Sequence, residues 1–396
     1  MEEAFFRTHT YLVEHTDAPV RRTLMDEIDW NDRLIGIKGT RGVGKSTFLL
    51  QYAKEHFGPH DRKCLFVNMN NFYFQSRGIA DFAGDFVKQG GRTLLIDQVF
   101  KQQDWSKELR KCYDLYPELK IVFTGSSVMR LKEENPELNG IVKSYNLRGF
   151  SFREFINLQT GNNFKAYELD DILRNHEHII KQILPKVSPM KYFKDYLHHG
   201  FYPFFLEQRN FTENLLKTMN MMTEVDILLI KQIELKYLPK IKSLFYQLAV
   251  EGAKAPNVSQ LADSINTSRA TVMNYIKYLA DARLINMIYP DGQDFPKKPS
   301  KVMMHNPNLM YAIYPIQIDT QEVMETFFVN SLWKDHKVHQ GGKDHFYTVD
   351  GNRKFRICDA QATNKIRSNP DTIYARYNTE VGKDNKIPLW LLGFLY

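Results

Sequence analysis

The apolar positions in the first third of the chain alternate between short runs and a longer amphipathic stretch. Residues 34–38 read LIGIK and residues 93–96 read TLLI, and such short apolar runs are typical of buried strands. Between them, residues 46–56 (STFLLQYAKEH) carry apolar side chains at helical spacing. This alternation of strands and helices predicts an α/β fold.

A glycine-rich loop joins the first of these strands to the helix. Residues 39–46 read GTRGVGKS, which matches the phosphate-binding pattern G-x-x-x-x-G-K-[ST]. Lys45 is expected to reach the β and γ phosphates of ATP, Ser46 to offer its hydroxyl to magnesium, and Thr47 to contact the α phosphate. The alternative is a glycine-rich turn without a ligand, and the flanking strand and helix disfavour it. The residues expected to bind ATP and Mg²⁺ are Gly39, Thr40, Arg41, Gly42, Val43, Gly44, Lys45, Ser46 and Thr47.

A carboxylate follows the apolar run at 93–96. Asp97 is the expected second contact to magnesium, beside Ser46. The next residue is Gln98, whose amide cannot accept a proton from an attacking water, so slow or absent ATP hydrolysis is expected. Gln98 is either a natural loss of a catalytic base or a substitution introduced to trap ATP, and the sequence leaves both open. The plainer interpretation is an ordinary buried strand that ends in a capping Asp.

A third strand-like run, IVFTGSS at 121–127, ends in small hydroxyl residues. Ser126 is the candidate for sensing the γ phosphate, since a polar side chain at the end of a strand can face the ligand. Ser126 and Ser127 could equally cap a following helix. Gln98 and Ser126 are therefore the candidate catalytic positions.

A helix-turn-helix pattern follows a helix-rich stretch at about 161–250. Residues 256–285 place apolar residues at the spacing of two amphipathic helices, with Asn266 in the turn and Thr267 or Ser268 as the cap of the second helix. Residues 284–289 (LINMIY) predict a wing strand, and the Pro- and Lys-rich loop 290–300 predicts the wing tip. DNA binding or a packing role for this module both remain open. The candidate DNA contacts are Arg269, Met273, Asn274 and Lys277.

The last part of the chain predicts a mixed α/β region. A helix is expected to begin near Glu325, in ETFFVNSLWKD. The β-like runs HFYTV, KFRICDAQA and IPLWLLGFLY follow it.

These motifs together resemble a family of prokaryotic AAA-type ATPases that carry a C-terminal domain of unknown function. The likeness also rests on VRRTLMDEIDWNDRLIGIKG before the loop, RGFSFREF at 148–155 and YPFFLEQ at 202–208, and it spans nearly the whole chain. It implies an AAA-type P-loop domain, then a helical and winged-helix region, then a small α/β module similar to restriction-endonuclease-like PD-(D/E)xK folds.

The chain departs from the family pattern at several positions. The family usually reads DEVHK where residues 97–101 read DQVFK, so the glutamate and the histidine are missing. An arginine pair that could contact a neighbour's γ phosphate is replaced by NGIV at 139–142, which leaves Arg148 and Arg153 as candidates. A capping box at 151–154 gives Arg153 a plainer role. The resemblance implies a homo-oligomer, but the missing arginine pair leaves a monomer open.

The nuclease-like module lacks the residues that nuclease chemistry needs. That chemistry requires an acid and an acid-x-lysine pair that hold a metal ion. Arg356 stands where an acid is expected, and Ala360 or Gln361 falls near the lysine position. No nuclease activity is expected, because these replacements leave three acids without partners: Glu325, Asp344 and Asp350.

Composition adds constraints on partners and compartment. A formal charge of +7 with pI about 9.0 mildly favours polyanions. Cys64, Cys112 and Cys358 form no CxxC pair, so neither a zinc site nor a disulfide framework is expected. No apolar run approaches the length of a membrane span and the start has no signal-peptide pattern, which predicts a cytoplasmic protein without membrane contact.

The expected organisation is a P-loop AAA-type domain at 1–160, a helical lid or linker at 161–240, a winged helix-turn-helix at 241–300 and a degenerate nuclease-like domain at 301–396. The expected function is an ATP-dependent switch that engages DNA or a protein partner. The alternatives are an active ATPase motor and a DNA-binding regulator with a structural nucleotide. In the motor, another carboxylate would replace Gln98, and the candidates are Glu154, Glu207 and Glu224.

Overall fold

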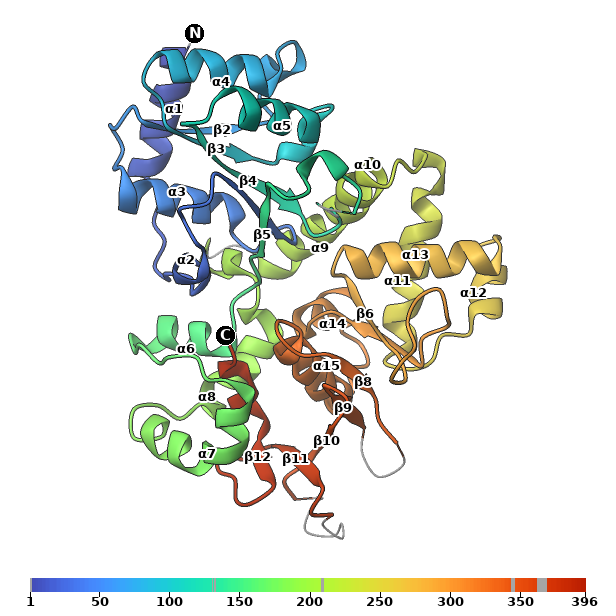
Figure 1. Cartoon of the computed structure of the whole chain (residues 1–396). Helices are drawn as coiled ribbons and strands as arrows, with labels where there is room; N and C mark the ends of the chain where they lie inside the picture. The colour runs from blue at the N-terminus through green and yellow to red at the C-terminus, as the bar shows by residue number, and fades with distance from the viewer. Residues whose placement is uncertain (1, 130, 132, 208–209, 343–345, 362–368) are drawn as a thin grey trace. The chain divides into compact units, whose positions relative to one another are not determined.

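The computed structural model describes the chain except residues 1, 130, 132, 208–209, 343–345 and 362–368. It divides into two compact units, Met1–Gly149 and Phe150–Tyr396. Each unit contains helices and at least one β-sheet (Figure 1).

The first unit is built on a parallel five-stranded sheet. Its order is β2-β3-β4-β1-β5, and every neighbouring pair is parallel. The strands are β1 (Leu34–Gly39), β2 (Cys64–Asn68), β3 (Thr93–Asp97), β4 (Lys120–Ser126) and β5 (Lys143–Asn146). The central strands are almost continuously apolar because helices bury both faces of a parallel sheet. The α/β fold expected for this region is confirmed.

Helices and short turns connect these strands. The α-helices are α1 (Glu2–Glu14), α2 (Leu24–Glu27), α3 (Lys45–His56), α4 (Ile79–Lys88) and α5 (Trp105–Leu115). The 3-10 turns are η1 (Phe72–Gln75), η2 (Val99–Lys101) and η3 (Pro136–Leu138). Helices α4 and α5 pack together, and α1 packs against α3 and β2. Figure 1 shows α4 and α5 on one side of the sheet and α3 on the other.

The second unit begins with a helical region. Its elements are α6 (Phe152–Thr160), α7 (Leu169–Ile183), α8 (Met190–Asp195), η4 (Tyr196–Gly200), η5 (Pro203–Glu207), α9 (Phe211–Met221), η6 (Met222–Ile227), α10 (Leu228–Ile230), η7 (Leu235–Tyr237) and α11 (Leu238–Glu251). Two of these, η4 and η6, are single π-helical turns. The helix-rich stretch expected here is present.

A helix-turn-helix and a hairpin follow. Helix α12 (Val258–Ser264) and helix α13 (Arg269–Asp281) flank a turn in which Asn266 has a φ of 50°. The Ser268 side chain caps α13 by accepting a hydrogen bond from the Thr271 N–H at 3.1 Å. Strand β6 (Ile285–Ile288) then pairs antiparallel with β7 (Lys301–Met304), so the expected boundary between residues 300 and 301 falls inside a hairpin.

The C-terminal region combines two helices with a mixed sheet. The helices are α14 (Pro307–Ile313) and α15 (Thr320–Leu332). The sheet has the order β12-β11-β10-β9-β8, in which β8, β9 and β10 are antiparallel neighbours and β10, β11 and β12 are parallel. The strands are β8 (Val338–Gln340), β9 (Tyr347–Val349), β10 (Arg353–Asp359), β11 (Thr372–Tyr377) and β12 (Lys386–Pro388).

Three details of this region differ from the sequence-based expectation. Helix α15 begins at Thr320 instead of near Glu325, because Asp319 caps it and its first turn is polar. Strand β11 was not expected. The terminal apolar run forms a strand only at Lys386–Pro388 and continues as the 3-10 helix η9 (Leu389–Phe394), all of whose residues are buried. A short apolar run does not by itself distinguish a strand from a buried helix.

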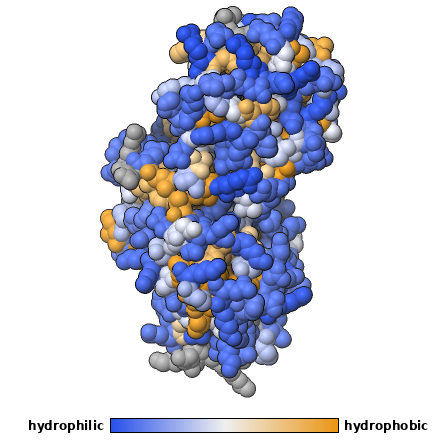
Figure 2. All heavy atoms as spheres, turned by 90° about the vertical axis from the view of Figure 1, so that its left-hand side faces the viewer, coloured by the Kyte–Doolittle hydropathy of each residue, from blue (hydrophilic) through white to orange (hydrophobic). Residues whose placement is uncertain are grey.

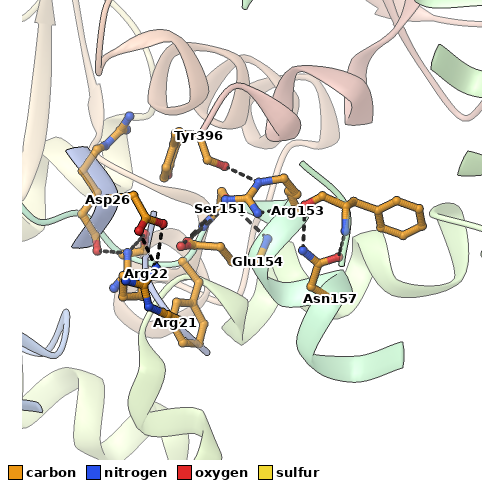
Figure 3. A network of polar contacts seen from close by, with 12 residues as sticks. Arg21, Arg22, Asp26, Ser151, Arg153, Glu154, Asn157 and Tyr396 are labelled. Atoms are coloured by element: carbon orange, nitrogen blue, oxygen red, sulfur yellow. Dashed lines mark hydrogen bonds and ion pairs between the residues drawn. The ribbon is translucent and has the colours of Figure 1, made fainter. Parts of the chain in front are cut away.

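The start of the second unit is fixed by a polar network that Figure 3 shows in close-up. The Ser151 hydroxyl accepts a hydrogen bond from the Glu154 N–H, and the Glu154 carboxylate accepts one from the Ser151 N–H, which completes the expected capping box of α6. The buried Arg153 guanidinium donates to the carbonyl oxygens of Tyr396 and Phe164, each at 3.0 Å. These contacts join α6 to the end of the chain.

The face drawn in Figure 2 is mostly hydrophilic, with separate hydrophobic patches. Among the residues that the structure describes, no helix is long and apolar enough to span a membrane.

Ser151→Ala is expected to lower the free energy of unfolding of the second unit by about 1 kcal/mol, because it removes the side-chain cap of α6. Urea unfolding followed by circular dichroism measures this change. Ser259→Ala, at an exposed position in α12, is the matched control and should leave the midpoint unchanged. Equal midpoints for Ser151→Ala and the unsubstituted chain would contradict the role of the cap.

Candidate nucleotide-binding site

The glycine-rich loop lies between β1 and α3, as expected. Gly44 is the residue before α3 and has a φ of 91°, a left-handed conformation that glycine adopts at low cost. Gly39 ends β1, and a Cβ atom built there would lie 2.4 Å from the Leu147 carbonyl oxygen. The loop therefore needs glycine at both positions, and α3 begins at Lys45 with its unsatisfied N–H groups at the loop.

The lysine of the loop contacts the loop itself. Lys45 Nζ lies 2.8 Å from the Gly39 carbonyl oxygen and 2.7 Å from that of Thr40. These contacts hold the ammonium group above the loop, where phosphate oxygens can replace carbonyl oxygens as acceptors. Thr47, the expected contact to the α phosphate, is exposed at the first turn of α3.

Asp97 is the centre of the polar contacts at the ends of the strands. The residue is 1% exposed. The Ser46 hydroxyl donates to Oδ2 at 2.7 Å, and the Asn68 amide donates to the same oxygen at 2.9 Å. The Thr124 hydroxyl donates to Oδ1 at 2.5 Å. The structure therefore brings together Ser46 and Asp97, the two residues expected at the magnesium site.

The sequence interpretation missed Asn68 and Thr124. They lie on β2 and β4, the two neighbours of β3, and both reach Asp97. A polar residue near the carboxyl end of a neighbouring strand could have indicated each of them. The sequence does not show which strands neighbour β3, and this is known only from the sheet order.

Gln98 follows Asp97 in an uncommon backbone conformation. Its φ is 56° and its ψ is 48°, in the left-handed region that residues with a Cβ atom rarely adopt. Its N–H donates to the Thr124 hydroxyl oxygen at 2.8 Å. Thr124 therefore holds both the carboxylate of Asp97 and the backbone of the next residue.

Ser126 ends β4 directly beside the loop. It is paired in register with Gly39 and is 3% exposed. Its hydroxyl oxygen accepts the Val128 N–H at 3.4 Å, and residues 127 and 128 form a turn instead of starting a helix. The capping alternative is therefore wrong for Ser126, and its role as a sensor stays a prediction.

Arg22, which the sequence interpretation did not single out, supports the loop from behind. Its guanidinium is buried and donates to the carbonyl oxygen of Val43 at 3.2 Å. It also donates to the carbonyl oxygens of Arg148 at 2.7 Å and Gly149 at 3.1 Å. Arg22 therefore ties the P-loop to the last residues of the first unit.

Arg153 is excluded as an arginine finger. Arg153 is 7% exposed, and its guanidinium bonds to the main chain of the second unit. A finger has to reach the nucleotide of a neighbouring subunit, and a buried guanidinium with carbonyl partners cannot do so.

The four candidate DNA contacts lie on α13 and differ in how far their side chains are exposed to solvent. Arg269 and Asn274 are exposed, and Met273 is partly exposed. Lys277 donates to the Asp281 carboxylate at 2.6 Å, so part of its charge is already compensated. Arg269 is therefore the strongest of these cations for contact with an anion.

The acids that the sequence singled out in the C-terminal region have other polar partners. Glu325 has partners that were not expected, since its Oε2 atom lies 2.7 Å from Lys301 Nζ and accepts the Tyr347 hydroxyl at 2.6 Å. Asp350 accepts from His336 at 2.8 Å and from Arg353 at 2.6 Å. Asp344 lies outside the described residues. No group of three or more His, Cys, Asp or Glu side chains in the described part of the chain could hold a metal ion.

Thr124→Val should weaken magnesium-dependent ATP binding by about tenfold, because it removes the hydrogen bond to Asp97 Oδ1 and the acceptor of the Gln98 N–H, while Ser46 and Asn68 still donate to Oδ2. A titration with a fluorescent ATP analogue, with magnesium and with EDTA, measures the effect. Thr124→Ser keeps the hydroxyl and should bind as tightly as the unsubstituted chain. A weakening that is the same with EDTA would contradict a role at the magnesium site.

Comparison with known proteins agrees with this site. A family described as "AAA domain" matches residues 31–156, and a family described as "Domain of unknown function (DUF8612)" matches residues 190–317. A curated relative, "Uncharacterized protein MJ1637" of Methanocaldococcus jannaschii, is 26% identical over 294 residues, which cover 70% of this chain and 61% of that protein.

Two solved structures are similar only at a low level. RuvB from Thermotoga maritima is 14% identical with a TM-score of 0.28, and the match covers 72% of this chain and 89% of that one. Orc1 from Aeropyrum pernix, solved with DNA, is 10% identical with a TM-score of 0.29, covering 80% and 92%. The first family match and the site together show that residues 31–156 form an AAA-type P-loop domain, which a match to a domain of unknown function follows at residues 190–317.

Proposed function

We propose that this protein is an ATP-dependent switch that hydrolyses ATP slowly or not at all and engages DNA through its helix-turn-helix. The observation that carries the proposal is the contact between Ser46 and Asp97 at the end of a complete P-loop, next to a glutamine where a catalytic carboxylate is usual.

The geometry fits a magnesium ion bound together with a nucleotide. Two oxygen ligands on adjacent corners of a magnesium octahedron lie about 3 Å apart, given metal–oxygen distances of about 2.1 Å. Ser46 Oγ and Asp97 Oδ2 are 2.7 Å apart. Magnesium usually takes few ligands from protein and the rest from phosphate and water, which suits a site with one carboxylate. Lys45 and the N–H groups of the loop would hold the phosphates.

Slow hydrolysis follows from the residue at position 98. An amide does not accept a proton, and a general base typically contributes about 100- to 10,000-fold to a rate. The other carboxylates considered lie in the second unit, where Glu154 completes the cap of α6 and Glu224 pairs with Lys242 at 2.5 Å. Both are already used inside that unit, which favours the switch over the motor.

Gln98→Glu is expected to raise steady-state ATP turnover by about 100- to 10,000-fold, because it restores a carboxylate beside the magnesium site. Turnover is measured beside the unsubstituted chain, with Lys45→Ala as the blank and ATP binding followed in parallel. Brisk turnover by the chain with Gln98 would overturn the switch. Tight ATP binding with no turnover in either form would keep the switch and show that a second catalytic group is missing.

DNA is the partner that the second unit favours. Helix α13 is capped at Ser268 and presents the exposed Arg269 in its first turn. The hairpin β6–β7 after α13 would form the wing of a winged helix, which supports the proposal. The net charge of +7 points the same way. A regulator in which the nucleotide only stabilises the fold is the second candidate, and DNA affinity that is indifferent to nucleotide would favour it.

Arg269→Gln should weaken duplex DNA binding by about 1–3 kcal/mol, the usual cost of losing one arginine contact. Lys277→Gln should cost less, because Asp281 already compensates part of that charge. Fluorescence anisotropy with and without ATP measures both effects. Lys217→Gln removes an exposed cation from α9 and is the charge control. Equal affinities for Arg269→Gln and this control would contradict α13 as the DNA-binding helix.

A further inference from the structure

Three cations from adjacent strands share one face of the C-terminal sheet. In the parallel pairing of β10 with β11, Arg356 lies opposite Tyr374, and Cys358 lies opposite Arg376. In the pairing of β11 with β12, Tyr374 lies opposite Lys386. Paired residues and residues two apart on a strand point to the same face, so Arg356, Arg376 and Lys386 project from one side of the sheet.

These cations have no carboxylate partner among the described residues. The Arg356 guanidinium stacks over the Phe346 ring, with 5.4 Å between its carbon and the ring centroid. The only hydrogen bond of the Arg376 side chain within the described part of the chain runs from Nη2 to the Ala360 carbonyl oxygen at 2.5 Å. Both arginines bury their Nε atoms without an acceptor there. Such partly buried charges are costly unless an anion compensates them.

The environment of Cys358 shows that the charges converge. Burial raises the pKa of the Cys358 thiol to about 11, while the positive charges of Arg356, Arg376 and Lys386 act in the opposite direction. Asp359, the next residue on β10, lies on the other face by strand alternation. Its carboxylate accepts the Gln361 N–H at 2.7 Å and the Asn378 amide at 2.5 Å.

The cluster also lies where a sheet of parallel strands commonly binds ligands. Cys358 and Arg376 are each the last residue but one of their strands, β10 and β11. Ligands of open α/β sheets bind beyond the carboxyl ends of parallel strands. The position of the cluster and its uncompensated positive charge therefore both favour an anionic ligand.

We propose that Arg356, Arg376 and Lys386 form a phosphate-binding site on the C-terminal sheet. Guanidinium groups present paired N–H donors that match the oxygens of a phosphate, and Lys386 adds a point charge. The phosphate belongs either to the backbone of a nucleic acid or to a free phosphate ion. The site does not depend on the P-loop or on the helix-turn-helix.

The test uses the full chain carrying Lys45→Ala, so that the P-loop lysine does not contribute to phosphate binding. Fluorescein-labelled single-stranded DNA is titrated by anisotropy at several salt concentrations, and inorganic phosphate is titrated by calorimetry. Arg356→Gln and Arg376→Gln are each expected to weaken binding of the phosphate ligand by about tenfold or more. Lys217→Gln, which removes an exposed cation from α9 outside the C-terminal sheet, is the matched control and should bind like its parent.

The two probes distinguish the sources of the phosphate. Weaker DNA binding, with a salt dependence reduced by about one ion per substitution, assigns the site to a nucleic-acid backbone. Lost phosphate binding with unchanged DNA affinity assigns it to a free ion. Unchanged binding of both probes would overturn the proposal, as would an equal loss in Lys217→Gln, since that result indicates diffuse attraction.

Stability is measured on every variant by urea unfolding. If an arginine variant is destabilised, Lys386→Gln is used to test the proposed phosphate site instead. Lys386 begins β12 and is only partly buried, so its substitution should leave the fold intact. Binding by a folded Lys386→Gln chain that equals its parent would then overturn the proposal.

Discussion

The site depends on the carboxylate of Asp97 more than on any other group. Hydrogen bonds to its two oxygens come from Ser46 at the start of α3, Asn68 at the end of β2 and Thr124 on β4. A buried carboxylate is stable only when such donors compensate its charge. The same three bonds therefore fix the spacing between the loop and the ends of the three strands.

Local pattern was sufficient to predict much of this chain. The P-loop, the strand before Asp97, the capping box at Ser151 and the cap at Ser268 are each specified by a few consecutive residues, and the structure has all of them. Thr124, Asn68 and Arg22 could not be found in this way. Their partners are distant in sequence, and they become neighbours only through the strand order β2-β3-β4-β1-β5 and the packing of the loop.

The C-terminal region shows where pattern alone fails. The polar first turn of α15 hid its start at Thr320, and the apolar terminal run did not reveal that it becomes the 3-10 helix η9. The sequence predicts that Glu325 lacks the partners of a nuclease site. In the structure its partners are Lys301 on β7 and Tyr347 on β9. Burial raises the pKa of Tyr347 well above its usual range, so this hydroxyl stays protonated and donates to the carboxylate. The Glu325 carboxylate is therefore held between a cation and a hydroxyl donor.

Arg22 couples the position of the P-loop to the position of residues 148 and 149. Its guanidinium donates hydrogen bonds to the Val43 carbonyl oxygen in the loop and to the carbonyl oxygens of Arg148 and Gly149, where the first unit ends. Because a guanidinium is rigid and planar, it keeps the Val43 carbonyl group at a fixed distance from those of Arg148 and Gly149. A shift of the loop when phosphates bind would therefore move residues 148 and 149, from which the polypeptide leaves the first unit.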